Sequence, residues 1–401
     1  MSRIKRTRYL FFHLEDGREL DLTALDRGAV ELAPGAPELF ALSILTGARY
    51  QIGRSELDVL LSVPADRWVA PPDDDHGVVH ALVERGLLLS DAEDEPPATL
   101  RERDAGLHAA QWHLYAALYH FMTQWDGVDV RTPGSEGADL PALSPVTASE
   151  EEAFRREHGP APPVFAPRRS HGQAVPLPPV ERTDGLYASL LRRATARAFD
   201  RGVPMTTDQL STLLFYVFGA HGFARTLGDA VIMRRTSPSG GGLHPVEAYA
   251  LISNVSGIAP GAYHYSVEHH ALDPLFALSA DAARATATDF TCGQSYFGEA
   301  HVSFVLSARF SRAHWKYRRH EKAYAAILMD AAHLSQTLYL VSAQLGLGAY
   351  VTVAVNGRDI EARLGLDGWA EGVVAMAGCG PRRPAEHSPL EPPFVPDLAL
   401  L

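Results

Sequence analysis

The chain has 401 residues, 46% of them apolar and 21% charged, a composition typical of globular proteins. Its net charge of −12 at pH 7 argues against a nucleic-acid partner. Only two cysteines are present, Cys292 and Cys379, and no CxxC pair occurs, which argues against a disulfide framework and a cysteine metal site.

No membrane span or signal peptide is predicted. The apolar run near the start, Tyr9–Phe12, is too short for a signal-peptide core, and no later segment approaches the length needed to cross a bilayer. We therefore expect a cytoplasmic protein with reduced thiols.

Residues 1–95 mix short strand patterns with short helical patterns. RYLFFHL (8–14) and RELDL (18–22) are typical of strands, with a turn at EDG between them. ELDVLLSV (56–63) and GVVHALVERGLLLSD (77–91) are helical, and Gly86 stands where a helix would end. We expect a winged-helix-like domain.

Residues 96–180 are predicted to form one helix followed by a linker. The helix covers RDAGLHAAQWHLYAALYHFMTQW (103–125), whose apolar stripe includes Leu107, Tyr115, Leu118 and Met122. Ten prolines then fall between Pro133 and Pro179 without sustained periodicity. Because proline interrupts helices and central strands, this stretch predicts a linker or an extended wrapping arm.

From 181 to 401 the patterning predicts an α+β domain. TTDQLSTLLFYVFGAHG (206–222) is typical of a capped helix ended by glycine, whereas VEAYALIS (246–253), HVSFVLSARF (301–310) and GVVAMAGCG (372–380) are strand-like. A long helix over 323–348 is apolar around most of its circumference, which indicates burial in a core or an oligomer interface. Its main stripe is Ile327, Ala331, Leu334, Leu338, Val341 and Leu345.

Several common active-site motifs are absent. The chain lacks a phosphate-binding loop, a dinucleotide fingerprint, a nucleophile elbow and an HExxH zinc motif, and its 18 histidines are scattered. We expect no metal site.

A glycine-rich segment and three basic clusters remain. RRTSPSGGGLHPVEAY (234–249) holds three successive glycines, which suit an unusual turn or a backbone edge against a flat polar ring. The clusters lie at 192–201, 309–322 and 382–383. Each alone is typical of a solvated face, but joined by the fold they would form an anion pocket.

In their ordered combination, these segments resemble the flavin-dependent nitroreductase superfamily. The likeness is to its SagB-type branch, the dehydrogenases that mature thiazole- and oxazole-containing peptides. It covers about residues 105–125 and 185–385, with Thr195 where the family usually has serine. The matching segments are LYHFMT (118–123), RRATARAF (192–199), SPSGGGLHPVEAY (237–249), GAYHY (261–265), AVNGRDIEARLGL (354–366) and VVAMAGCGPRR (373–383).

The resemblance implies a nitroreductase-like FMN-binding fold, with a central, mostly antiparallel sheet flanked by helices. It also implies a homodimer with FMN at the subunit interface. The glycine loop would lie against the isoalloxazine, the first basic segment would hold the phosphate and ribityl chain, and two N–H groups would face the redox-active edge. The implied residues are Pro238, Ser239, Gly240 and Gly241; Arg193, Thr195 and Arg197; Asn356 and Gly357; and Arg382 or Arg383 for the phosphate.

The branch also carries a Lys-Tyr pair, which corresponds here to Lys316 and Tyr317. By spacing alone, the pair is typical of a solvated lysine beside a core tyrosine. By resemblance, the tyrosine removes a proton, a nearby ammonium favours the phenolate, and hydride passes to the flavin N5. Adjacent side chains can serve one site only at the end of an element or in an irregular segment.

The implied function is oxidation of an azoline, or a similarly activated residue, in a ribosomally made precursor peptide. Residues 1–95 would bind the leader by strand addition, or serve only in packing or dimerisation, and a cyclase partner is compatible with this branch. A small-molecule nitro- or flavin reductase using NAD(P)H and a flavin-free recognition scaffold are the alternatives. Asp330 and Ala331 stand where the branch often has Glu and Gly, so the substrate class is less defined than the cofactor.

Overall fold

The computed structural model describes residues 2–20, 32–72, 76–93, 97–130, 177–225 and 231–383, with isolated positions between 149 and 165. Most of the predicted proline-rich arm lies outside the described residues.

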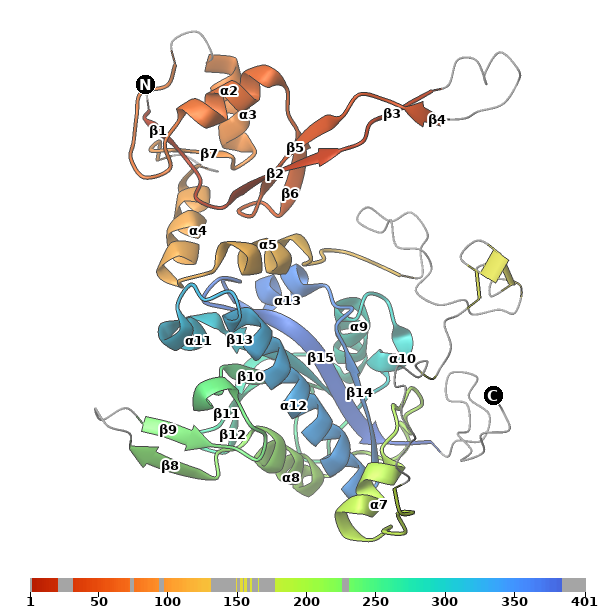
Figure 1. Cartoon of the computed structure of the whole chain (residues 1–401). Helices are drawn as coiled ribbons and strands as arrows, with labels where there is room; N and C mark the ends of the chain where they lie inside the picture. The colour runs from red at the N-terminus through yellow and green to blue at the C-terminus, as the bar shows by residue number, and fades with distance from the viewer. Residues whose placement is uncertain are drawn as a thin grey trace.

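A six-stranded antiparallel sheet forms the centre of the C-terminal part (Figure 1). Its strand order is β12-β11-β10-β13-β15-β14. The strands predicted at 246–253, 301–310 and 372–380 are confirmed. The bounds are β10 (Val246–Ile252), β11 (Gly261–Ser266), β12 (Ala271–Ala277), β13 (Val302–Arg309), β14 (Leu347–Thr352) and β15 (Glu371–Pro381).

Helices cover both faces of this sheet, because alternate strand residues point to opposite sides. α8 (Thr207–Phe218) and α12 (Ala323–Gln344) pack against one face, where Ala248 and Phe304 are buried. α9 (Ala280–Phe290) and α13 (Gly357–Leu364) pack against the other, where Leu251 is buried. The predicted nitroreductase-like arrangement of a mostly antiparallel sheet between helices is confirmed.

The long helix α12 is a core helix with one exposed apolar stripe. Ile327, Leu334 and Leu338 of the predicted stripe are buried. Leu328 and Met329 are 37% and 59% exposed. The sequence predicts that most of the circumference of this helix is buried in a core or an oligomer interface. The core leaves these two apolar side chains uncovered.

The capped helix predicted at 206–222 is confirmed as α8. The Thr206 side chain accepts a hydrogen bond from Gln209 N, and the Gln209 side chain accepts one from Thr206 N in return. After Gly219, a hairpin of β8 (Gly222–Arg225) and β9 (Val231–Arg234) projects from the body of the domain (Figure 1). The sequence analysis did not identify this hairpin.

The N-terminal part has its own apolar core, which includes Ala41, Leu60 and Leu82. Gly86 has a φ of +64° after α3, as expected for a helix end. The winged-helix-like assignment stays a prediction, although the strands and short helices on which it rests are present. They are β1 (Ile4–Arg6), β2 (Leu10–Glu15), β3 (Arg18–Leu20), β4 (Leu32–Pro34), β5 (Glu38–Ser43), β6 (Ala48–Gln51), α2 (Arg54–Ser62), α3 (His76–Glu84) and β7 (Leu88–Ser90).

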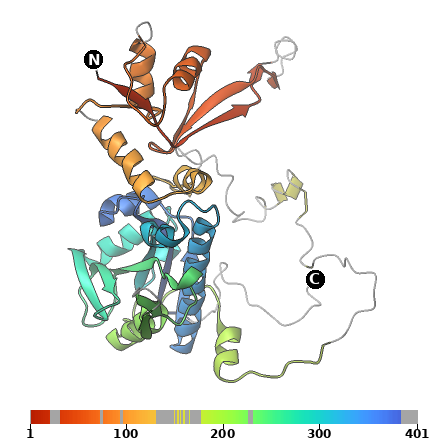
Figure 2. The same ribbon diagram turned by 60° about the vertical axis from the view of Figure 1, so that its left-hand side comes forward.

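The single helix predicted over 103–125 is wrong. Two helices, α4 (Pro97–Ala109) and α5 (Leu114–Met122), are separated by Gln111, whose φ of +59° ends the first helix. The break turns Trp112 into the core, where it is 1% exposed and its Nε1 donates to Trp369 O at 2.8 Å. The apolar stripe continues across the break because both helices bury one face, so periodicity did not reveal it. Both helices lie between the N-terminal and C-terminal parts (Figure 1, Figure 2).

Both cysteines are buried, and burial raises the pKa of each thiol to about 12. Within the described ranges, no group of three or more His, Cys, Asp or Glu side chains is arranged to hold a metal ion. None of the helices in the described part of the chain is long and apolar enough to cross a membrane.

Candidate functional site

The glycine segment forms a short 3-10 turn, Gly240–Gly242, directly before β10. Gly241 and Gly242 have φ values of +65° and +70°, a conformation that side-chain-bearing residues rarely adopt. A Cβ on Gly242 would meet nothing within 4 Å, so one side of the loop is open.

Asp330 of α12 anchors this loop. Its carboxylate accepts hydrogen bonds from Ser239 Oγ at 2.5 Å and from Gly240 N at 3.0 Å. Ser239 Oγ in turn accepts one from His244 N at 2.8 Å. Asp330 is 5% exposed, so these charge-assisted bonds hold the loop firmly against α12. Ser239 and the Gly240 N–H, both expected to face the flavin, are thus already bonded within the chain.

Lys316 and Tyr317 reach the same glycine loop from the end of α11 (Phe310–Tyr317). Lys316 Nζ donates to Gly241 O at 3.3 Å. A Cβ placed on Gly241 would lie 2.6 Å from both Lys316 Nζ and Tyr317 Oη. The pair therefore converges on one point because it occupies the last turn of the helix, which Arg318 ends with a φ of +42°. Because Gly241 has no side chain, it leaves room for both of these side chains.

The predicted phosphate-binding arginines gather at the edge strand β14. Ala196 N donates to Ala349 O of β14 at 2.8 Å, and Arg383 N donates to Ala198 O at 3.2 Å. A Cβ on Gly348 would lie 2.5 Å from Ala196 Cβ and 3.5 Å from Arg382 Cδ. The fold therefore brings two basic segments together that lie far apart in the sequence. Arg382 is half-buried beside Gly348, whereas Arg383 is exposed.

Tyr339 of α12 holds the start of the first basic segment. Its hydroxyl is 3.0 Å from Thr195 Oγ1, within hydrogen-bond distance. The guanidinium of Arg193 lies 5.5 Å from the centre of the Tyr339 ring, within cation–π range. Arg197 lies 5.9 Å from the centre of the Tyr296 ring.

The glycine loop and the arginine cluster are attached to opposite flanks of α12. Asp330 and Tyr339 are nine residues apart, which in an α-helix is about two and a half turns and about 14 Å along the axis. The two anchors therefore point in opposite directions. The family resemblance implies one site for both groups, but within one chain the helix separates them.

Asn356 and Gly357 begin α13. The Asn356 side chain donates to the carbonyls of Val128, at 3.0 Å, and Asp289, at 2.8 Å, and accepts from Val128 N at 2.9 Å. Its backbone N–H donates to Phe290 O at 3.0 Å, and that of Gly357 donates to the carbonyl two residues earlier. Both N–H groups expected at the redox-active edge are therefore donated within the chain.

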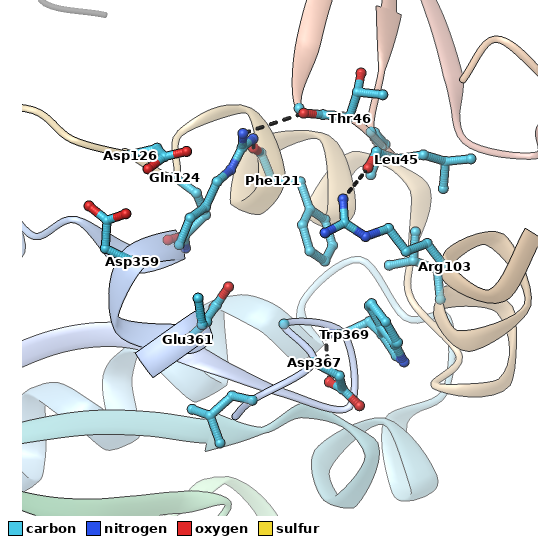
Figure 3. A pocket seen from close by; sticks show the side chains of 17 residues that line it. Leu45, Thr46, Arg103, Phe121, Gln124, Asp126, Asp359, Glu361, Asp367 and Trp369 are labelled. Carbon is cyan, nitrogen blue, oxygen red and sulfur yellow. Dashed lines mark hydrogen bonds between the residues drawn. The ribbon is translucent and has the colours of Figure 1, made fainter. Parts of the chain in front are cut away.

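A cavity of about 380 Å³ lies between α13, α5 and the N-terminal part (Figure 3). Arg358 donates to the carbonyls of Thr46 and Phe121, and Arg103 donates to that of Leu45. Because both cations bind backbone carbonyls of other elements, they hold α13 and α4 to the N-terminal part.

Glu361 projects into this cavity from α13 (Figure 3). Its Oε1 accepts a hydrogen bond from Val373 N at 2.9 Å. Burial raises the pKa of Glu361 to about 7, although that hydrogen bond and Arg358 oppose the shift. In the same cavity, the hydrogen bond with Asp359 raises the pKa of Asp126.

Comparison with known proteins identifies the C-terminal part. Residues 190–380 match the model of the nitroreductase family. These residues are a nitroreductase family domain. The family consists of flavin-binding oxidoreductases, so the domain belongs to an oxidoreductase class.

Two characterised proteins are similar to the chain. The trifolitoxin-processing protein TfxB of Rhizobium leguminosarum bv. trifolii is 24% identical over 309 residues, 76% of this chain and 79% of TfxB. The microcin B17-processing protein McbC of Escherichia coli is 29% identical over 144 residues, 35% of this chain and 51% of McbC. Among solved structures, a chain of the E. coli microcin synthetase McbBCD complex with truncated pro-MccB17 bound covers 66% of this chain and 91% of its own length, with 19% identity and a TM-score of 0.46.

The nitroreductase domain has a donor set that fits a flavin phosphate. The segment that carries Arg193, Thr195 and Arg197 meets the segment that carries Arg382 at β14. Guanidinium groups bind phosphate through planar, paired donors, so arginines and a hydroxyl on two adjoining segments suit the anionic end of the cofactor. The open side of Gly242 suits the approach of a flat ring.

Two supporting residues were not assigned from the sequence. Asp330 was noted only as a departure from the branch pattern, and Tyr339 was not singled out at all. No local signal marks Tyr339, because its partners Thr195 and Arg193 lie about 145 residues earlier.

Glu361→Gln should flatten the pH dependence of stability. The folded chain keeps the Glu361 proton up to about pH 7, whereas an unfolded glutamate loses its proton near pH 4.3. The free energy of unfolding of the natural chain should therefore fall, by up to about 3 kcal/mol, as the pH rises through this window. Denaturant unfolding at pH 5 and pH 8 measures this. The exposed Glu102→Gln is the control, and an equal pH dependence in the Glu361→Gln and natural chains would contradict the assignment.

Proposed function

We propose that this chain is an FMN-dependent dehydrogenase of ribosomal-peptide maturation that oxidises an azoline or a similarly activated residue. The observation that carries the proposal is the convergence of Lys316 Nζ and Tyr317 Oη on the glycine loop of a nitroreductase family domain. Such a pair supplies proton chemistry, which desaturation needs in addition to a hydride acceptor.

The relatives support a peptide as the substrate class. TfxB and McbC are named for processing trifolitoxin and microcin B17, and TfxB aligns over 76% of this chain, which extends well outside the nitroreductase domain. The N-terminal part is the proposed binding site for a precursor leader, added as a strand to an edge of the β2-β5-β6 sheet. A cyclase subunit is a proposed further partner.

Arg193, Thr195, Arg197 and Arg382 are the proposed holders of the FMN phosphate and ribityl chain. Arg382 is preferred over Arg383 because it is half-buried against Gly348 and Ala196. For the backbone N–H groups of Asn356 and Gly357 to bond the redox-active edge of the flavin, each must first release the carbonyl to which it now donates.

In the proposed reaction, Tyr317 Oη accepts the proton from the weakly acidic carbon of the substrate. To act as a base this oxygen must be a phenolate, and Lys316 Nζ, 5.8 Å from the centre of the Tyr317 ring, places a positive charge that favours the phenolate before it takes the proton. When bound, the flavin supplies the hydride acceptor. Asp330 keeps the loop in place beneath both side chains.

A homodimer would complete the proposed site. The glycine loop and the arginine cluster lie on opposite flanks of α12, so one copy cannot offer both to the same flavin directly. A second copy packed on the exposed stripe at Leu328 and Met329 would bring the loop of one chain to the arginines of the other.

Tyr317→Phe should abolish peptide oxidation but leave the protein yellow, because it removes the oxygen that takes the proton as a phenolate and keeps the ring in place. We expect at least about a hundredfold loss of the 2-dalton mass decrease of a modified precursor peptide, as for removal of a general base. Mass spectrometry measures peptide oxidation, and absorbance measures flavin content.

Unchanged turnover in Tyr317→Phe and Lys316→Ala would refute the catalytic assignment. A colourless protein would refute the cofactor, and NADPH-driven quinone turnover without peptide oxidation would favour a reductase.

Gly241→Ala should lower peptide oxidation more than Gly242→Ala. Both substitutions place alanine at a positive φ, which costs each chain about 1 kcal/mol of stability. Only the methyl group at 241 would meet Lys316 Nζ and Tyr317 Oη, at 2.6 Å. Turnover of the two variants, compared at equal folded fraction, measures the contact, and equal turnover would show that it is irrelevant to the reaction.

Met329→Glu should dissociate the dimer and lower flavin content, because it buries a charge in the proposed interface. Sedimentation velocity measures the mass, and absorbance measures the flavin. Leu61→Glu is the control, since Leu61 is 64% exposed on α2, away from α12. A monomeric natural chain that retains flavin would contradict the shared site.

A further inference from the structure

Another cavity, of about 660 Å³, lies at the far end of the glycine loop. The β8–β9 hairpin, the residues after the loop, β11 and the start of α11 line it. Phe223 and Val231 of the hairpin provide an apolar wall and are 69% and 54% exposed. The volume lies within the range of ligand pockets, and an apolar wall with a few polar groups is typical of them.

Three arginines face this cavity, and among the described residues only Arg309 lies within ion-pair distance of a carboxylate. Arg309 Nη1 lies 3.1 Å from Glu247 Oε1, and His264 Nε2 lies 3.6 Å from Glu247 Oε2. Both carboxylate oxygens of Glu247 are thus engaged, and the interaction of His264 with Glu247 raises the pKa of that imidazole. Glu268, the other acidic residue of the lining, is exposed at the rim.

Arg235 and Arg312 form no ion pair with any carboxylate of the described residues. Arg235 is 6% exposed, its Nη1 donates to Val246 O at 3.0 Å, and its Nε has no hydrogen-bond partner. Arg312 donates to Leu243 O of the loop. Glu247 also attracts Arg235, so this one buried carboxylate is shared by Arg235, Arg309 and His264, and the cavity keeps an excess of positive charge.

We infer that this cavity binds a carboxylate of the peptide substrate, paired with Arg235 and Arg312; the inference rests on the proposed function. The carboxylate comes from an acidic side chain or from the peptide C-terminus. The substrate must then carry a negative charge at a fixed distance from the residue that is oxidised.

The spacing on α11 sets that distance. Arg312 and Lys316 are four residues apart, so they lie on one face of the helix, separated by about 6 Å along its axis. Both side chains donate to carbonyls of the same loop, at Leu243 and Gly241. Because an extended peptide advances about 3.3–3.6 Å per residue, the carboxylate lies about two residues from the carbon that Tyr317 deprotonates.

The test uses hippurate, a carboxylate attached to a peptide-like amide, and its neutral analogue hippuramide. Calorimetric titration of the purified full chain should show salt-sensitive binding of hippurate and no binding of hippuramide. Arg312→Gln should weaken hippurate binding by about tenfold or more, as expected for loss of a charge-assisted hydrogen bond. Arg312→Lys should restore part of it. Arg234→Gln is the control, because Arg234 is exposed on β9 and does not line the cavity.

Equal binding of hippuramide, or equal weakening by Arg312→Gln and Arg234→Gln, would overturn the inference. Binding of inorganic phosphate in place of hippurate would also overturn it, in favour of a nucleotide phosphate. The titration needs no turnover, so its outcome is separate from that of the proposed function. A chain that binds hippurate but oxidises no peptide refutes only the reaction, whereas peptide oxidation without a carboxylate preference refutes only this pocket.

Discussion

The bonds between Asp330 and the glycine loop are the constraint on which the site depends. A buried carboxylate must be satisfied, and here Ser239 and the Gly240 N–H satisfy it. This fixes Gly241 where Lys316 and Tyr317 can reach it from α11. The two proposed catalytic side chains therefore owe their common position to an anion on a third element, α12.

The same helix also separates the two halves of the proposed cofactor site. Its Asp330 flank carries the glycine loop, and its Tyr339 flank carries Thr195 and Arg193. The helix holds these two flanks facing opposite ways, which supports the proposed site shared between two copies. The exposed Leu328 and Met329 lie on the same helix, which links assembly to cofactor binding in this proposal.

The N-terminal part is joined to the nitroreductase domain through side chains as well as through the chain. Trp112, between α4 and α5, packs against Phe310 of α11 with ring centres 4.6 Å apart, and Arg358 of α13 donates to Thr46 O of the N-terminal part. Both α11 and α13 border the proposed site, one at the catalytic pair and the other at Asn356 and Gly357. A peptide bound at the N-terminal part would therefore bind a part of the chain that already contacts elements bordering the proposed site.

Much of the fold was readable from the sequence, because burial imposes local periodicity and caps on the chain. The strands β10, β13 and β15, the capped helix α8 and the core stripe of α12 follow from patterns within about 25 residues. The motif segments also indicated which residues cluster, including the Lys-Tyr pair and the two basic segments. The tertiary structure alone decided the break at Gln111, the role of Asp330, and the separation of loop and arginines. Each of these depends on where a long-range contact places one side chain, and local periodicity does not predict such contacts.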